Sequence, residues 1–176
     1  MKGIAIVILV LLSTGTGSGF QDPGEWIKYH SPKGSYEVLV PAEPGLSKQE
    51  ILTSNGKKVI QYRATASESN FAVFVAYYDY APGMSYRLEQ ARDVMVGSTG
   101  TLLSARRIML EGHPGLEMNI SAKRPNAIEL LVRVRIYDVD RRVYVLQFII
   151  PRSEDNNVSA EKATRYFDSF RVTKRP

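Results

Sequence analysis

The sequence predicts an α+β fold in which a mostly antiparallel β-sheet is flanked by helices. The main observation is that apolar and polar residues alternate along most of the chain, which is typical of half-buried strands. Two segments instead repeat apolar residues at helical spacing, and turn residues separate the runs. There is no cysteine, and residues 20–176 are enough for one domain that is stable without disulfides.

Four strands are expected in the first half of the chain. Tyr36 to Val40 ends at a proline, which cannot donate a hydrogen bond to a sheet. Leu46 to Leu52 and Lys57 to Ala64 flank Ser54-Asn55-Gly56, and Asn-Gly tolerates the positive φ values of a tight hairpin turn. Asn70 to Tyr78 alternates strongly and forms the fourth strand.

A helix is expected after these strands. Leu88, Ala91 and Met95 occupy positions i, i+3 and i+7, which lie on one face of a helix. Ser85 can cap its N-terminus, and Gly97 can end it.

Three more strands are predicted at residues 102–110, 116–122 and 128–136. His113-Pro114-Gly115 indicates a turn between the first two, because proline fixes φ and glycine adopts the left-handed region. The third strand is apolar on one face only, so we expect its other face to be incompletely covered.

The chain is expected to end with a buried strand and a helix. Asp138 to Arg142 is a turn, and Val143 to Ile150 is apolar on both faces except for Gln147, so this strand should be covered above and below. A helix from Ser159 to Phe167 follows, with start signals in the preceding Asp and Asn residues. Phe170 and Val172 belong to a short final segment.

The N-terminus predicts export. Lys2 supplies a positive charge, Ile4 to Leu12 is apolar, and small residues from Ser13 to Gly19 follow. This is the pattern of a cleaved signal peptide at residues 1–19, and the apolar run is too short for a spanning helix. A secreted or periplasmic protein without a transmembrane span is therefore expected.

The charge is mildly positive. The chain carries +5 in total, and Arg106-Arg107 and Arg141-Arg142 are adjacent arginine pairs. These suit an anionic surface or partner, although an ordinary exterior looks similar. The RNA-recognition signature is missing and exported proteins rarely meet nucleic acid, so no nucleic-acid partner is expected.

No catalytic, metal or cofactor site is expected. The chain has two histidines, His30 and His113, both predicted to lie in loops, and it lacks a Gly-x-Ser-x-Gly elbow. Asp138 and Asp140 are interpreted as turn residues rather than calcium ligands. The catalytic alternative is a small secreted hydrolase that uses His113 with Glu117 or an aspartate.

Arg133, Arg135 and Tyr137 form the candidate binding group. Strand alternation places them on one face in steps of about 7 Å, where they could clamp phosphates or carboxylates. The alternative is an ordinary solvated face in which the arginines pair with Glu129 and its neighbours.

Four segments, taken in order, resemble parts of the PsbP/Mog1-like domains. Ser31–Pro41 resembles their opening strand, and Gly112–Glu117 resembles their central turn. Arg142–Leu146 resembles their penultimate strand, and Tyr166–Val172 resembles their closing helix and strand. The resemblance implies an α/β/α sandwich around an antiparallel sheet and proteins that bind and assist rather than catalyse. Plant members are extrinsic photosystem II subunits, the yeast namesake binds a small GTPase, and many bacterial members are exported. None of the family's metal or photosystem contacts is carried over to a position of this chain.

The sequence therefore predicts an exported, non-catalytic binding or accessory protein. Its expected partner is a protein or anionic ligand of the cell envelope. A third hypothesis is an envelope carrier of an apolar ligand, which requires a cavity of several hundred Å³ between sheet and helices.

Overall fold

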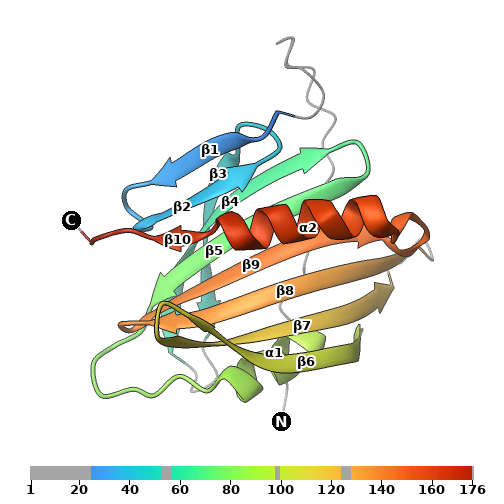
Figure 1. Ribbon diagram of the computed structural model, residues 1–176. Helices are drawn as coiled ribbons and strands as arrows, with labels where there is room; N and C mark the ends of the chain where they lie inside the picture. The colour runs from blue at the N-terminus through green and yellow to red at the C-terminus, as the bar shows by residue number, and fades with distance from the viewer. Residues whose placement is uncertain (1–24, 53–56, 98–99, 124–127, 176) are drawn as a thin grey trace.

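The computed structural model describes residues 25–52, 57–97, 100–123 and 128–175, which form two sheets (Figure 1). The larger has the strand order β3-β4-β5-β9-β8-β7-β6 and the smaller β1-β2-β10, with every pairing antiparallel. The elements are β1 (Ile27–Ser31), β2 (Tyr36–Val40), β3 (Gly45–Leu52), β4 (Lys58–Glu68), β5 (Phe71–Asp79), α1 (Leu88–Val96), β6 (Gly100–Leu110), β7 (His113–Lys123), β8 (Glu129–Val139), β9 (Arg142–Pro151), the 3-10 helix η1 (Arg152–Glu154), α2 (Asn157–Ser169) and β10 (Arg171–Val172).

The large sheet is packed on both faces. On one face, α2 and the small sheet bury an aromatic-rich cluster that includes Tyr36, Tyr144 and Tyr166. On the other face, Leu88 of α1 joins an aliphatic cluster around Met118. The predicted antiparallel sheet with helices is thus confirmed. The α/β/α sandwich is seen only in part, because a small sheet shares one cover with α2.

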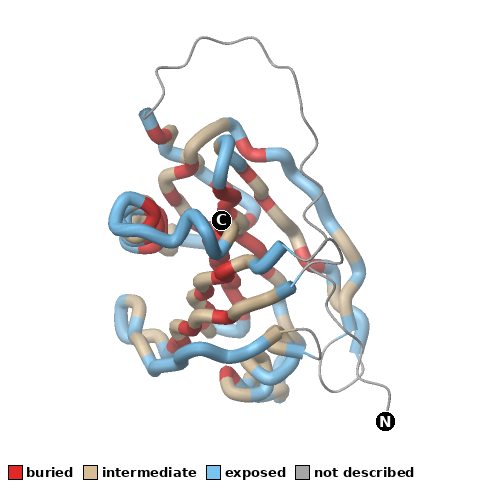
Figure 2. The backbone as a smooth tube through the Cα atoms, turned by 90° about the vertical axis from the view of Figure 1, so that its right-hand side faces the viewer, coloured by how far each residue is buried: buried red, intermediate tan, exposed pale blue. Residues whose placement is uncertain are grey.

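The central strand β9 explains why the sheet needs two covers. All its residues from Arg142 to Ile150 are buried, as the apolar pattern on both faces predicted. Even Gln147 is buried. Figure 2 shows the same arrangement, with buried backbone in the middle of the molecule and exposed backbone around it.

The turn predicted at His113-Pro114-Gly115 is wrong, because β7 already begins at His113. The chain turns instead at Glu111 and Gly112, whose φ angles are 51° and 86°. Gly115 has a packing role: a Cβ there would lie 2.5 Å from the Tyr137 ring and 2.7 Å from the carbonyl oxygen of Ile136. His30 also lies in a strand, β1, rather than in a loop.

The helix boundaries were predicted with mixed success. Ser85 does not cap α1, whose N-cap position is Arg87 without a side-chain cap, whereas Gly97 does end the helix with φ 56°. At α2, Asn156 forms a capping box with Ser159: each side chain accepts a hydrogen bond from the other residue's backbone N–H, both at 3.0 Å. This second helix therefore starts where the sequence signals predicted.

Arg142 links the two sheets. Its buried guanidinium donates to both carboxylate oxygens of Asp79, at 2.7 and 2.8 Å. It also donates to the carbonyl oxygens of Lys33 and Gly34, at 3.0 and 2.9 Å, in the turn before β2. The hydroxyl of Tyr144 donates to the same Gly34 carbonyl at 2.8 Å.

Two predictions fall outside the described residues: the signal peptide at residues 1–19 and the hairpin turn at 54–56. The strands that flank this turn, β3 and β4, do pair antiparallel, with Leu52 opposite Lys58. No helix in the described part of the chain has the length and apolar character needed to cross a membrane.

Candidate functional site: an open face of the large sheet

The large sheet extends beyond the cover that α2 provides. In Figure 1, α2 lies over the middle of the sheet, and β6, β7 and the lower part of β8 continue past it with no described element in front of them. We call this surface the open face. Its polar residues are Ser104 and Arg106 of β6, Glu117, Asn119 and Ser121 of β7, and Arg133 and Arg135 of β8.

The strand register aligns six of these side chains in two rows across the sheet. Arg106 lies opposite Glu117, which in turn lies opposite Arg135. In the next row, Asn119 lies between Ser104 and Arg133. Directly opposite residues on adjacent strands have Cβ atoms about 5 Å apart, so their side chains can interact.

The first row is a continuous ion-pair network. One carboxylate oxygen of Glu117 accepts from Arg106 Nε at 2.7 Å, and the other accepts from Arg135 Nε at 2.7 Å. Arg135 Nη1 also donates to Asp168 of α2 at 2.8 Å, and its guanidinium lies 4.9 Å from the centre of the Phe167 ring. Burial raises the pKa of Glu117, but the hydrogen bonds from both arginines outweigh this and leave the pKa below its usual value.

The second row is held by Asp155, which lies in the segment that follows β9. Asn119 Nδ2 donates to Ser104 Oγ at 2.9 Å, and Arg133 Nη2 donates to Asp155 at 2.7 Å. Asp155 directly follows η1, and its second oxygen lies 3.4 Å from Arg152. Both rows are therefore polar, partly exposed and already hydrogen-bonded.

The structure brings together two of the three residues that the sequence singled out. Arg133 and Arg135 lie on the open face as expected. Tyr137, which shares their strand face, is only 3% exposed because its ring stacks on Phe170, with ring centres 6.1 Å apart. It supports the core, and its ring is not accessible to a partner in this conformation.

Sequence reasoning did not connect Arg106, Asp155 and Asp168 with this group. Each comes from a different part of the chain, and only the strand register and the position of α2 bring them to Arg133 and Arg135. The adjacent Arg106-Arg107 pair was the one available signal.

The hydrolase hypothesis gains no support from this geometry. His113 and Glu117 are four positions apart on β7, which separates them by about 13 Å along the strand, beyond hydrogen-bond reach. Asp138 accepts a hydrogen bond from the Tyr80 hydroxyl at 2.9 Å. His113 does act electrostatically on Asp138, but burial still raises the pKa of that carboxyl, and within the described ranges no ion pair joins the two residues.

A metal site is not indicated either. In the part of the chain that the structure describes, no group of three His, Asp or Glu side chains converges as metal ligands would. Of the two aspartates considered for calcium, Asp138 accepts a hydrogen bond from the Tyr80 hydroxyl instead.

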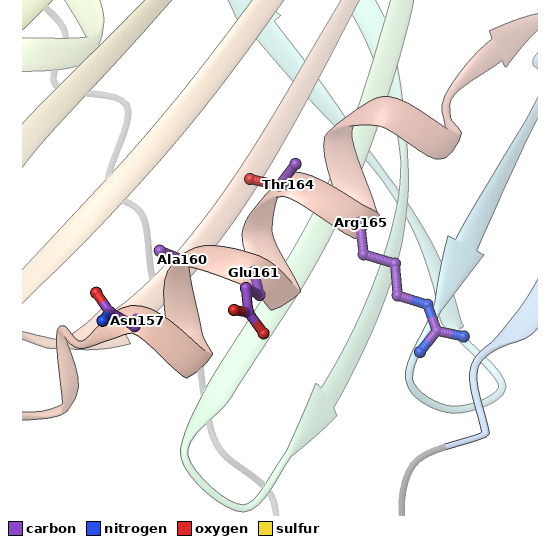
Figure 3. Close-up of a pocket in the computed structure, with 5 residues that line it drawn as sticks. All are labelled: Asn157, Ala160, Glu161, Thr164 and Arg165. Carbon is purple, nitrogen blue, oxygen red and sulfur yellow. The ribbon is translucent and has the colours of Figure 1, made fainter.

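A shallow depression lies along the outer side of α2. Figure 3 shows its lining side chains, which are those of Asn157, Ala160, Glu161, Thr164 and Arg165. It lies outside the core and is wide open to solvent. It is therefore not the enclosed cavity between sheet and helix that an apolar-ligand carrier requires, and side chains of the two core clusters occupy both faces of the sheet.

The fold and the open face together define an α+β protein that presents a polar, uncovered part of its sheet to solvent. Its structure is similar to cyanobacterial PsbP from Synechocystis sp. PCC 6803, with a TM-score of 0.56 and 14% identity over 90% of this chain and 98% of that chain. The chain thus has a PsbP/Mog1-like fold, which confirms the resemblance at the level of fold.

Two other solved structures align with lower scores. One is PA94 from Pseudomonas aeruginosa, a protein of unknown function, with 12% identity and a TM-score of 0.45 over 87% of this chain and 99% of that one. The other is a Bacteroides thetaiotaomicron protein, with 9% identity and a TM-score of 0.47 over 84% of this chain and 48% of that one. No protein-family model and no curated protein matches the chain.

Proposed function

We propose that this chain is an exported, non-catalytic binding or accessory protein that contacts its partner through the open face. The observation that carries the proposal is the polar surface of β6, β7 and β8 at and beyond the edge of α2, whose side chains are hydrogen-bonded and remain partly exposed. Residues 1–19 would direct export. The PsbP-like fold supports an accessory role, because the resemblance to this family implies proteins that bind and assist rather than catalyse.

The charge distribution favours a protein partner over a small anion. Arg133 and Arg135 are each paired with a carboxylate, and only about a fifth of each side chain is exposed. A free phosphate or carboxylate would have to compete with these bonds, so the surface offers little net positive charge. A protein surface can instead match a fixed pattern of donors and acceptors, and such complementarity gives specificity more than raw affinity.

The test needs a variant that blocks the open face without breaking its ion pairs. Truncating Arg133 and Arg135 is poorly suited, because Arg135 also holds α2 through Asp168. Ser121→Lys is better: Ser121 lies on the open face and donates to Glu129, which could pair with the new ammonium group. Thr164→Lys adds the same charge to the exposed outer side of α2 and serves as the matched control.

Mature wild-type and variant chains would be used as bait in extracts of the source organism's envelope, and captured proteins quantified by mass spectrometry. We expect a partner that wild type and Thr164→Lys both capture and that Ser121→Lys loses, with unchanged melting temperatures. Equal capture by all three chains would exclude the open face as the contact. Turnover of substrate by the purified chain would contradict the non-catalytic assignment.

A further inference from the structure

The strand β6 forms one edge of the large sheet. Among the described elements it pairs only with β7, so one side of its backbone has no strand partner. Most of its residues are exposed, and Met109 reaches 65%. An exposed edge of this length offers a row of free N–H and C=O groups to which another extended chain can add.

The edge is regular over its second half. The pairing with β7 is irregular between Leu102 and Ser104, and from Ser104 to Leu110 every residue has a partner in unbroken register. A bulge can protect an edge by twisting it away from other chains. Here it leaves the seven residues from Ser104 to Leu110 with standard strand pairing, which is long enough to bind a peptide strand.

Two adjacent arginines mark the middle of this segment. Successive strand residues point to opposite faces, so Arg106 lies on the open face and Arg107 on the α1 side. Their side chains are 68% and 75% exposed. Arg106 pairs with Glu117 and Arg107 with Glu89 of α1. Each guanidinium has five N–H donors, so donors remain on both after these contacts.

The same pair of arginines selects the kind of strand that can add. A second copy of this chain, paired about Arg106 and Arg107 by two-fold symmetry, would bring four guanidinium groups together, and like charges in opposite positions destabilise a sheet. A strand with two neighbouring carboxylates would place one acid on each face, opposite one arginine. Charge-assisted bonds of this kind are about twice as strong as neutral ones.

We propose that the β6 edge binds an extended acidic peptide segment by strand addition. Ser104 to Leu110 supply the backbone hydrogen bonds, Arg106 and Arg107 bind adjacent carboxylates on the two faces, and Met109 contacts an apolar side chain. This inference rests on the proposed binding function and adds to it a second contact and the chemical class of the partner.

The test uses the mature chain and a fluorescent peptide, Val-Thr-Val-Glu-Glu-Val-Thr-Val, with binding followed by anisotropy. We expect saturable binding that weakens with added salt. The double substitution Arg106→Gln and Arg107→Gln should weaken it by about tenfold or more, because two charge-assisted hydrogen bonds are lost. The control, Lys48→Gln with Lys174→Gln, removes the same charge elsewhere and should change the affinity by less than about twofold.

Two altered peptides separate strand addition from simple charge attraction. A peptide with Lys-Lys in place of Glu-Glu should not bind. A peptide that keeps both glutamates but carries N-methyl groups on consecutive backbone nitrogens should also fail, because the methyl groups then block both of its edges and it cannot pair with β6. Binding of the N-methylated peptide as tight as that of the parent, or no binding of the parent peptide, would overturn the proposal.

The outcome can be separated from that of the proposed function. Loss of partner capture by Ser121→Lys tests the open face, whereas the peptide assay reads the edge directly. If partner capture depends on the open face but the peptide does not bind, the edge proposal is wrong and the proposed function stands.

Discussion

Replacing Arg142 tests how the small sheet is held on the large one. Arg142 is 8% exposed, whereas the side chain of its carboxylate partner Asp79 is 54% exposed. In Arg142→Met the long apolar stem is kept, and the carboxylate of Asp79 can be rehydrated. The Gly34 carbonyl keeps the Tyr144 hydroxyl as donor, but the bond from Arg142 to the Lys33 carbonyl is lost.

The expected cost follows from these contacts. An acceptor that loses its partner away from water costs about 1–3 kcal/mol, and the half-exposed ion pair adds at most about 1 kcal/mol after solvent screening. We therefore expect Arg142→Met to lower the free energy of unfolding by about 1–4 kcal/mol. Asp79→Asn keeps an acceptor for the guanidinium and should cost only about 1 kcal/mol.

Urea denaturation of the mature chain measures both values. Hydrogen exchange supplies the local readout: Arg142→Met should speed exchange in β1 and β2 and leave β7 and β8 unchanged, because only the small sheet loses its link. If Asp79→Asn lowers the free energy of unfolding as much as Arg142→Met or more, the reasoning is refuted, because the exposed ion pair would then contribute most of the stabilisation.

Three further predictions concern pH, packing and capping. The pKa of Glu117 is lowered in the folded chain, so the ionised side chain stabilises the fold above its unfolded pKa near 4.5, and this stabilisation is lost as pH falls through the folded pKa. In Glu117→Gln, the free energy of unfolding should therefore depend less on pH in that range. Gly115→Ala places a Cβ 2.5 Å from a buried ring and should cost about 1–3 kcal/mol in urea unfolding, whereas Gly45→Ala, with its nearest atom at 3.8 Å, should be nearly neutral. Asn156→Ala should lower stability by about 1 kcal/mol, and Ser85→Ala, at a helix start without a side-chain cap, should not change the thermal midpoint.

The sequence predicts the elements whose signals are local. Val143 to Ile150 must be covered on both faces because Gln147 is its only strongly polar residue, and β9 is indeed buried from Arg142 to Ile150. The start of α2 is marked because Asn156 can cap only a helix that begins next to it. The turn after β6 was misplaced because Pro114 and Gly115 are turn residues by composition, whereas Gly115 is needed for packing against Tyr137.

In the small sheet, the sequence predicted β2 with its observed bounds but not its pairing with β1 and β10. β1 alternates weakly, and β10 has only two residues, so neither carries a strong periodic signal. Both are strands because β2 lies between them and pairs with each. The burial of Tyr137 has the same origin, because the residue that covers it, Phe170, is contributed by the distant C-terminal segment.

The open face and the β6 edge are continuous through Arg106. This residue ends the row that contains Glu117 and Arg135, and it also lies at the centre of the exposed edge. A strand added beside β6 would extend the sheet by one position, so its carboxylate next to Arg106 would continue the alternation of acid and base across the open face. A partner that used both surfaces would gain backbone hydrogen bonds from the edge and side-chain complementarity from the face, while a partner with the wrong charge order would place like charges together. The paired arginines would therefore act mainly by selecting the correct partner, and most of the affinity would come from the backbone of β6.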